Sequence, residues 1–499
     1  MVTRRPYEIR ASDLPLVRIL IISDSPKYVL TFESPAIMTG PTDNLLPLGD
    51  FLPSDRWQTH VNAIFYGTIG SDIHDHFQTY VSRDYRLAYS LAKEFFIKAT
   101  VSGEIDKTLF VLEWGVGNGN LASSFLDRLK EIDEEGLVYP RIKYVLCDFS
   151  PEILKVVINN SRLKKHEGRF VAVQVDAESM KCFKPKSIFK IISNEIWDDL
   201  SCKAILLDED LIYEEYLQPY LDPSQVPMDW DEFLVLFKEK NLERLRELPL
   251  FLGAIRWERN YQRADISDWP FADEIQSHID QLTDENVIPI NVGAFESLKT
   301  AFNLLSEKNI GYTGMDYGML SIEDVREMGR PYFNLYGGQY TFMVNFPLLE
   351  KVAKTIGFTE AFTQYQHHFV ECQLQESVIS VLELLQSHPK VARMESWERD
   401  ILMLQTLNAF AGIYESPYEN KINYPAMPGT PKKYIKKIDE LSNKLDPYGI
   451  PDTVAYISQS EVVSAEKKLR KLGYKENRMQ SAFVNFAQPV SFVYSCFEK

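Results

Sequence analysis

One stretch of the chain places three glycines at alternate positions directly behind a glutamate. In VLEWGVGNGN the glutamate is Glu113, and the glycines are Gly115, Gly117 and Gly119. Glycine weakens a strand but adopts left-handed backbone conformations freely, so these glycines indicate a turn against which a ligand lies closely. The spacing departs from the Gly-x-Gly-x-x-Gly of dinucleotide sites, because Asn120 stands at the sixth position. A nicotinamide site and a purely structural turn remain as alternatives.

The pattern resembles motif I of class I S-adenosylmethionine-dependent methyltransferases. The resemblance implies that the methionine and ribose part of the cofactor lies against the bare backbone of the glycine turn. It also implies a carboxylate after the next strand for the ribose hydroxyls, and YVLCDFS supplies Asp148 there, followed by Phe149. A polar group after the third strand would meet adenine, and VQVDAES supplies Asp176, followed by Ala177. The cofactor predicted from these residues is S-adenosyl-L-methionine.

The elements that must position these residues alternate between strands and helices. The strand-like runs are apolar, and the helix-like runs are amphipathic. The strand-like runs are TLFVLEWG, IKYVLCDFS, RFVAVQVDAES, IFKIISNEIWDDL and YTGMDYG; the helix-like runs are SRDYRLAYSLAKEFFIKA, NLASSFLDRLKEI, PEILKVVINNSRLKK and AFESLKTAFNLLSEKNIG. This alternation predicts an α/β fold, in which helices cover both faces of a parallel sheet. With the motif I resemblance, it predicts a class I methyltransferase-like Rossmann sheet.

The sequence predicts five parts along the chain. Residues 1–66 form an N-terminal extension, in which VRILIIS and KYVLTFE make a β-hairpin. The cofactor-binding methyltransferase core spans 67–213 and resumes over 291–372. A helical insertion over 214–290 is a candidate lid or substrate region. An α+β C-terminal extension covers 373–499, where SAEKKLRKLGY predicts a helix and SAFVNFAQPVSFVYSCF predicts two strands around a turn. Its role, as an added sheet edge or an oligomerisation element, stays open.

A narrower resemblance follows the fourth predicted strand. SNEIWDDL resembles the Asn-Glu-x-x-Asp-x-Leu signature of the MidA-type methyltransferase family, which includes a mitochondrial assembly factor that methylates an arginine of a complex I subunit. Other pieces resemble family segments in the family's order: DHFQTYVSRDYRLAYSLAKEF, GMDYG, GGQYTFMVNFPLLEKVAKTIGF and, as a closing strand, QHHFV. The resemblance covers residues 67–370 without the insertion. It departs from the family at DDLSCKA and in the absence of a proline-glycine form of motif I.

This resemblance implies that the methyl acceptor is an arginine guanidinium of a protein substrate. Carboxylates must orient such a cation, and they also raise the nucleophilicity of its nitrogen. Glu195 and Asp198 stand three residues apart, so in a turn both can face one pocket. Glu195 is predicted as the main acceptor of the guanidinium, and Asn194 as a group that positions substrate amides. Asp316 and Tyr317 are predicted to form the neighbouring wall. A capped strand end and a structural turn are the alternatives.

Composition bears on binding to nucleic acid, on membrane insertion and on the cellular compartment. The 499 residues carry 54 basic and 71 acidic side chains, a net charge of −17 that argues against nucleic-acid binding. No apolar run is long enough to predict a membrane span. Five scattered cysteines without a Cys-x-x-Cys pair indicate reduced thiols in the cytoplasm, although three arginines in the first ten residues keep a mitochondrial transit peptide as the minor alternative.

The histidines do not predict a metal. His74 and His76 flank Asp75, and His367 and His368 are adjacent. Elsewhere the sequence shows no cluster of metal-ligating residues that could complete a site with either pair. No metal site is therefore predicted.

The predicted function is methyl transfer from S-adenosylmethionine to a protein arginine in the cytoplasm, and a homodimer is left open. Two alternatives come from other functional classes. A non-catalytic assembly protein would keep Glu113, Gly115, Gly117 and Asp148 for the cofactor without a working substrate pocket. A small-molecule or lipid methyltransferase would show an apolar pocket under the insertion helices.

Overall fold

The chain was analysed as a computed structural model, which describes residues 44–69, 85–103, 107–175, 182–208, 211–282, 286–327, 330–336, 338–414, 417, 426, 429–445, 456–484 and 491–499. The predicted hairpin near the N-terminus, the DHFQTYVS segment and the pair Asp176 and Ala177 lie outside these residues. None of the described helices has the length and apolarity needed to cross a membrane.

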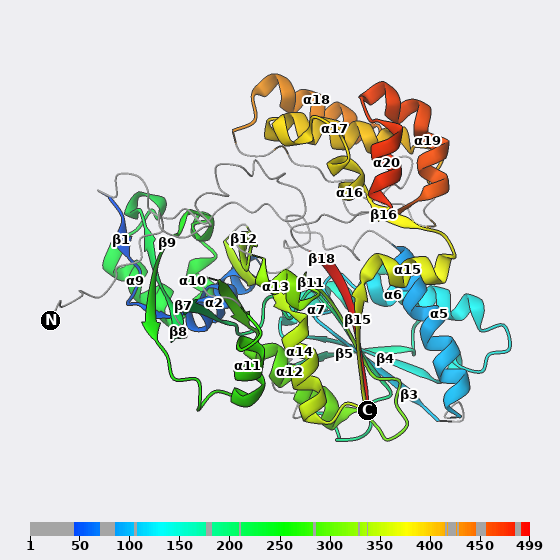
Figure 1. The fold of residues 1–499 in the computed structure, drawn as a ribbon, viewed down its shortest axis with the longest axis horizontal. Coiled ribbons are helices and arrows are strands. Elements are labelled where there is room, and N and C mark those ends of the chain that lie inside the picture. The colour runs from blue at the N-terminus through cyan, green and yellow to red at the C-terminus, as the bar shows by residue number, and fades with distance from the viewer. Residues whose placement is uncertain are drawn as a thin grey trace.

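A central sheet organises the chain (Figure 1). Its main strands, in chain order, are β3 (Leu109–Trp114), β4 (Ile142–Asp148), β5 (Phe170–Gln174), β6 (Lys190–Asn194), β11 (Tyr312–Met319), β15 (Glu360–Tyr365) and β18 (Ser491–Glu498). Their spatial order is β5-β4-β3-β6-β11-β18-β15, and the short β14 (Val344–Asn345) pairs with β11. The first five run parallel in the order 3-2-1-4-5 of doubly wound folds, whereas β18 is antiparallel to both its neighbours. The predicted class I methyltransferase-like α/β fold is thus confirmed.

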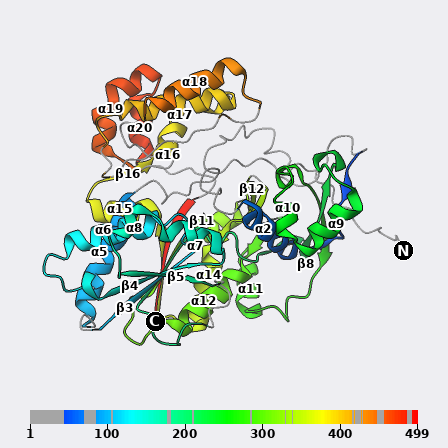
Figure 2. The same cartoon turned by 180° about the vertical axis from the view of Figure 1, so that it is seen from behind.

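The strands are apolar on both faces because helices cover both sides of the sheet (Figures 1 and 2). Side chains alternate between two cores, so that Val111 enters one and Leu112 enters the other. The Val111 core receives α5 (Tyr85–Ser102) and α6 (Asn120–Ile132). The Leu112 core receives α2 (Ser54–Ile69), α12 (Val292–Leu304) and α14 (Phe346–Ile356).

The helix predicted over PEILKVVINNSRLKK is divided into two. α7 spans Pro151–Ile158, and α8 spans Ser161–Lys164. The break has a local cause: the side chain of Asn160 accepts a hydrogen bond from the backbone of Arg162 at 2.9 Å and caps the second helix.

The first insertion follows β6 and holds a second, antiparallel sheet. Its strands are β7 (Lys203–Asp208), β8 (Leu211–Leu221), β9 (Arg256–Arg263) and β10 (Val287–Ile290), joined by β1 (Leu46–Pro47) and β2 (Leu52–Pro53) from the N-terminal part of the chain. The expected helices are present as α9 (Trp230–Glu239), α10 (Leu242–Leu245) and α11 (Ala272–Ile279). The prediction of a helical insertion is therefore corrected to a mixed one. Polar and apolar residues do not alternate regularly in β8 and β9, so the sequence of each gives no clear strand signal. Both form strands because they pair with each other.

The C-terminal strand completes the central sheet and is not an added edge. β18 lies between β11 and β15, where Val493 pairs with Asp316 on one side and with Tyr365 on the other. Its predicted strand partner is absent from the described residues, because Ser481 and Ala482 end helix α20 (Glu476–Ala482). The predicted closing strand QHHFV is also corrected: these residues begin helix α15 (Gln366–Leu374).

A helical cap is inserted between β15 and β18. After α15, the cap comprises β16 (Val378–Ser380), α16 (Val381–Gln386), α17 (Ser396–Ala409), α18 (Lys432–Asn443), β17 (Tyr456–Ser458), α19 (Gln459–Leu472) and α20. The cap leaves the sheet at the end of β15 and returns at the start of β18, so it emerges on the edge where the parallel strands end. Figure 1 shows its helices gathered above that edge.

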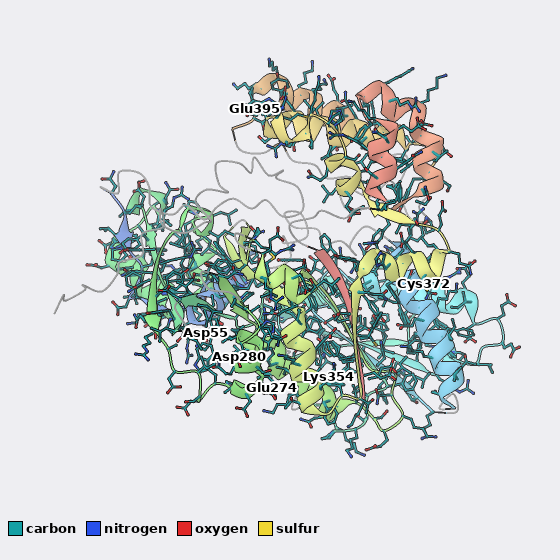
Figure 3. The ribbon with its side chains drawn as sticks, viewed as in Figure 1. Asp55, Glu274, Asp280, Lys354, Cys372 and Glu395 are labelled. Carbon is teal, nitrogen blue, oxygen red and sulfur yellow. The ribbon has the colours of Figure 1, made fainter. Side chains whose placement is uncertain are left out.

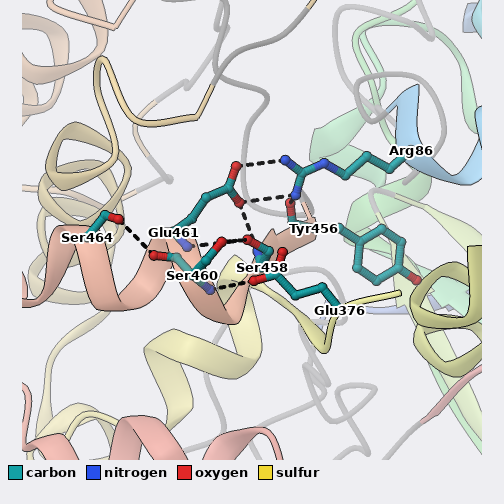
Figure 4. A network of polar contacts seen from close by, with 7 residues as sticks. All are labelled: Arg86, Glu376, Tyr456, Ser458, Ser460, Glu461 and Ser464. Atoms are coloured by element: carbon teal, nitrogen blue, oxygen red, sulfur yellow. Dashed lines mark hydrogen bonds and ion pairs between the residues drawn. The ribbon is translucent and has the colours of Figure 1, made fainter. Parts of the chain in front are cut away.

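One arginine of the core ties α5 to the cap (Figure 4). Arg86 donates from Nη1 to the backbone oxygen of Tyr456 at 2.7 Å, and from Nη2 to Oε1 of Glu461 at 2.7 Å. The two side chains are only 11% and 14% exposed. Glu461 also accepts the backbone N–H of Ser458 at 2.8 Å in the capping box of α19. The same carboxylate therefore both begins a cap helix and holds it to the core.

Replacing Arg86 should weaken this attachment. Removal of one partner leaves a largely buried carboxylate uncompensated, so we expect Arg86→Ala to lower the free energy of unfolding by about 3 kcal/mol. Denaturant unfolding measures the loss, and limited proteolysis tests whether the cap becomes the first part to be cut. Arg128→Ala is the matched control, because Arg128 pairs with Glu131 at 2.7 Å on an exposed helix face; it should change stability by at most about 0.5 kcal/mol. Equal losses for both variants would contradict the anchoring role.

Candidate functional site

Those predicted site residues that the structure describes lie at one edge of the central sheet. The strand register places Cys147 of β4, Trp114 of β3, Ser193 of β6 and Gly314 of β11 side by side. The segments that follow these strands therefore leave the sheet at the same edge, and the chain order reverses between β3 and β6. Such a switch point is where doubly wound sheets bind ligands.

The glycine turn needs its glycines for conformation and for packing. Gly115, Gly117 and Gly119 have φ values of 68°, 52° and 77°, all in the left-handed region that side chains disfavour. A Cβ atom on Gly115 would lie 2.4 Å from Cγ2 of Ile196, and one on Gly119 would lie 3.0 Å from Cδ1 of Leu163. The turn thus brings bare backbone to the switch point and leads into α6.

Glu113 lies behind this turn in the core. It is 2% exposed, and the hydroxyl of Tyr144 donates to its Oε2 at 2.7 Å. Burial raises the pKa of Glu113 to about 8, the hydrogen bond from Tyr144 opposes that rise, and the nearby Asp148 adds to it. The group therefore holds a proton near neutral pH and makes a buried polar contact with no charge to solvate.

Asp148 joins the end of β4 to the glycine turn. Its Oδ1 accepts the backbone N–H of Ser150 at 2.9 Å, and the backbone N–H groups of Gly117 and Phe149 also favour its charged form. Burial raises its pKa to about 6 despite these donors. Phe149 is 48% exposed beside it. A carboxylate thus stands next to the bare turn, with an exposed ring at its side. The two remaining residues predicted for the cofactor, Asp176 and Ala177, are outside the described part of the chain.

The segment after β6 takes an unusual backbone path at Glu195. This residue has a φ of 50°, which is uncommon for a residue with a side chain and is held here by a backbone hydrogen bond to the oxygen of Met315 at 2.7 Å. Its half-buried side chain accepts a hydrogen bond from Nδ2 of Asn194 at 3.2 Å. Glu195 lies near enough to Asp198 for its charge to add to the rise that burial causes in the pKa of Asp198.

Asp316 shapes this segment from the neighbouring strand. Its Oδ2 accepts the backbone N–H groups of Trp197 at 2.8 Å and Asp198 at 3.2 Å, and its Oδ1 accepts that of Tyr317 at 2.8 Å. Tyr317 in turn donates its hydroxyl to Oδ2 of Asp198. The structure therefore brings the two predicted groups together. It gives Asp316, only 1% exposed, a role in holding the loop.

These carboxylates crowd one another. Burial raises the pKa of Asp198 well above its usual range, and Asp316 and Asp199 raise it further. Burial likewise raises the pKa of Asp316, although the backbone N–H groups that it binds oppose the rise. In the part of the chain that the structure describes, no lysine or arginine pairs with Asp198, Asp199 or Asp316. The site thus concentrates acidic groups whose charge a bound cation would stabilise.

Two buried oxygens at this place accept no hydrogen bond from the described residues. They are Oδ1 of Asn194 and Oδ1 of Asp198, on either side of Glu195. Buried polar atoms are normally satisfied, so two acceptors in one turn indicate a place where a donor-rich ligand would bind.

The fold adds a cluster that the sequence did not reveal. Asp199 accepts hydrogen bonds from the hydroxyl of Tyr66, from Nε2 of Gln339 at 2.5 Å and from Nδ2 of Asn62 at 3.3 Å. The ring of Tyr66 also lies edge-on against Phe149, with centroids 5.6 Å apart. The cluster thus connects the acidic turn to the end of β4. Only the GGQYT run, which contains Gln339, hinted at it, because Tyr66 and Asp199 lie 133 residues apart.

Comparisons with known proteins find similarity to solved structures at low sequence identity. No protein-family model matches the chain, and no curated protein matches it. A COG1565 superfamily member from Burkholderia thailandensis bound to S-adenosyl-homocysteine is 13% identical, with a TM-score of 0.46 over 90% of this chain and 88% of that one. A native structure of a COG1565 superfamily protein from the same organism is 14% identical, with a TM-score of 0.42 over 81% of this chain and 86% of that one.

A third similar structure covers less of the chain. It is the trans-methyltransferase CalH in complex with SAH, 12% identical, with a TM-score of 0.29 over 56% of this chain and 53% of that one. At these identities and TM-scores the likenesses carry no argument about function. The fold class rests on the chain's own strand order.

The buried state of Glu113 predicts a pH dependence of stability. Its ordinary pKa is 4.5 and its pKa in the folded chain is about 8, so the folded chain binds this proton more tightly than the unfolded chain does. Its contribution to stability is therefore full below about 4.5 and is lost as the pH rises towards 8. Glu113→Gln should flatten this decline by up to about 1.4 kcal/mol per pH unit. Denaturant unfolding from pH 5 to 8 measures it.

Tyr144→Phe is the matched variant, since it removes the hydrogen bond that opposes the rise. It should extend the pH-dependent decline to higher pH, whereas Glu113→Gln should remove it. Identical slopes in the parent protein and Glu113→Gln would show that Glu113 is ionised throughout.

Proposed function

We propose that this protein is an S-adenosylmethionine-dependent methyltransferase that methylates an arginine side chain of a protein. The observation that carries the proposal is the meeting, at one switch point, of a bare glycine turn, the carboxylate of Asp148 and an acidic turn at Glu195. The first two suit a ribose-bearing cofactor, and the third suits a cationic acceptor.

The cofactor part rests on the residues around the end of β3. The left-handed glycines leave no side chain between the backbone and a ligand. Asp148 supplies a carboxylate of the kind that accepts hydrogen bonds from vicinal hydroxyls, and the exposed ring of Phe149 can pack against a flat base. These groups fit S-adenosylmethionine better than a dinucleotide. In the Gly-x-Gly-x-x-Gly motif of dinucleotide sites the last position is glycine, whereas this chain has Asn120 there.

The acceptor part rests on the chemistry of the acidic turn. Oδ1 of Asn194, the carboxylate of Glu195 and Oδ1 of Asp198 together offer several acceptors and few donors. A guanidinium group carries five N–H donors and a permanent positive charge. Binding such a group would satisfy the two buried oxygens and would favour ionisation of Asp198, whose pKa is raised by burial and by its acidic neighbours. A neutral small molecule would leave this acidic surplus uncompensated.

In the proposed reaction, S-adenosylmethionine supplies a methyl group on a sulfonium sulfur. Glu195 holds the guanidinium by charge-assisted hydrogen bonds and orients one nitrogen. Transfer would form a bond from that nitrogen to the methyl carbon and break the carbon–sulfur bond, with S-adenosylhomocysteine as the leaving group. The nitrogen would lose one proton, and Glu195 is the carboxylate proposed to accept it. Tyr317 holds Asp198 in place by its hydroxyl, and Asp316 holds the backbone of the turn.

Cofactor binding is tested by removing Asp148. We expect micromolar binding of S-adenosylmethionine and S-adenosylhomocysteine to the parent protein, and at least about tenfold weaker binding to Asp148→Ala, since a charge-assisted hydrogen bond contributes about 1.5–3 kcal/mol. Isothermal titration calorimetry measures both. The matched control is Asp222→Ala, because Asp222 also accepts the N–H of the serine two residues on, at 2.9 Å from Ser224, but on the surface. A folded parent protein that binds neither ligand would refute the cofactor assignment.

Methyl transfer is tested by neutralising Glu195. Glu195→Gln keeps the shape and the backbone path, so it should bind S-adenosylmethionine as the parent does while methyl transfer falls by about a hundredfold or more. Labelled methyl incorporation into proteins of a cell extract measures the transfer, and mass spectrometry of the product identifies the modified side chain.

Glu296→Gln, on an exposed helix face, is the control and should transfer methyl groups at the parental rate. Parental turnover in Glu195→Gln would remove the residue from the mechanism. Cofactor binding without transfer to any extract protein would instead favour the non-catalytic assembly protein. A labelled lipid or small molecule would favour the third alternative.

A further inference from the structure

Helix α15 begins at the same edge of the sheet as the acidic turn. Tyr365 ends β15 and pairs with Val493 of β18, which pairs with Asp316 of β11 on its other side. The start of α15 is thus two strand spacings from Asp316, or about 10 Å. The segment QHHFV therefore opens a helix at the edge where the proposed reaction takes place.

The first turns of α15 gather three metal-ligating side chains. One ligand atom from each of His367, His368 and Glu371 lies within 4.8 Å of the other two. The helix makes this possible, because residues three and four positions apart share one face, and Glu371 follows the two histidines at those spacings. The sequence drew attention to the histidine pair, but only the helical state brings the glutamate to it.

Two of the three side chains are held in place by their surroundings. The ring of His367 is buried and stacks on Tyr365, with centroids 5.3 Å apart and planes at 17°. Glu371 accepts the backbone N–H of Val378 through Oε1 at 3.0 Å, which fixes its carboxylate. His368 is exposed, so the cluster has access to solvent. Outer contacts of this kind orient the ligands of metal sites and hold them ready for the ion.

We propose that His367, His368 and Glu371 bind one divalent metal ion of the zinc class. Two imidazoles and one carboxylate form a nitrogen and oxygen donor set that suits Zn²⁺. Three protein ligands leave at least one coordination position open, which is the arrangement of zinc sites that bind water or a substrate oxygen. The site stands apart from the proposed methyl transfer, since it uses none of the groups assigned to the cofactor or the guanidinium.

Metal titration tests the site directly. We expect the full chain, freed of metal with a chelator and then dialysed, to bind one Zn²⁺ per molecule in competition with a chromogenic chelator. Co²⁺ should bind at the same place and give d–d absorption bands in the visible range. His368→Ala and Glu371→Gln should each weaken Zn²⁺ binding about tenfold or more and abolish the Co²⁺ bands. Glu371→Gln still offers an oxygen to Val378, so the helix should keep its fold.

Two matched variants separate this site from surface binding. Cys372→Ser removes the exposed thiol next to Glu371, which Figure 3 labels on α15. Glu360→Gln removes an exposed carboxylate from the opposite end of β15. Both should bind Zn²⁺ as the parent does. Added Zn²⁺ should also raise the thermal midpoint of the parent and of these controls, but not of the two ligand variants.

The outcomes distinguish the site from an incidental cluster. Binding of one ion that is lost in both ligand variants and kept in both controls supports the proposal. Absence of stoichiometric binding, binding kept in both His368→Ala and Glu371→Gln, or binding lost in Cys372→Ser would overturn it. None of these readouts depends on methyl transfer, so the metal site can fail while the proposed function stands.

Discussion

The acidic end of the sheet depends on the carboxylate of Asp316. This side chain accepts backbone N–H groups from Trp197, Asp198 and Tyr317, and so fastens the turn after β6 to the end of β11. Backbone donors favour the charged carboxylate, whereas its burial raises its pKa, so the loop geometry and the electrostatics of the site are set by the same group. Together with the backbone hydrogen bond from Glu195 to the oxygen of Met315, this fastening fixes the path of the turn at the end of the sheet.

Several buried carboxyl groups close together destabilise a folded chain unless hydrogen bonds or opposite charges replace the water that they lose. Tyrosine hydroxyls supply some of these hydrogen bonds, since Tyr66 donates to Asp199 and Tyr317 donates to Asp198. Raised pKa values for both aspartates show that the compensation is partial. Among the described residues, no lysine or arginine pairs with Asp198, Asp199 or Asp316 to complete it.

Both large insertions leave the sheet at the edge where its parallel strands end. The first follows β6 and builds a second sheet with strands from residues 46–53, and the cap follows β15 and is tied back to α5 through Arg86 and Glu461. Because the parallel strands end there, anything inserted after them must surround that edge. The elements that differ most from a plain doubly wound fold thus emerge at that edge.

The sequence alone determined the strands β3, β4, β5, β6 and β11, the glycine turn and the acidic positions at or near the ends of these strands. These follow from local periodicity, glycine spacing and the rule that parallel strands share a binding edge. The tertiary structure decided the rest: β18 enters the sheet between β11 and β15, β8 and β9 form a sheet in a segment that reads as helical, QHHFV becomes a helix, and Tyr66 and Gln339 meet Asp199. The reason is physical. Each of these features depends on a partner strand or side chain far away in the sequence, or on the packing around a short polar segment. The local pattern of side chains predicts neither the distant partners nor this packing.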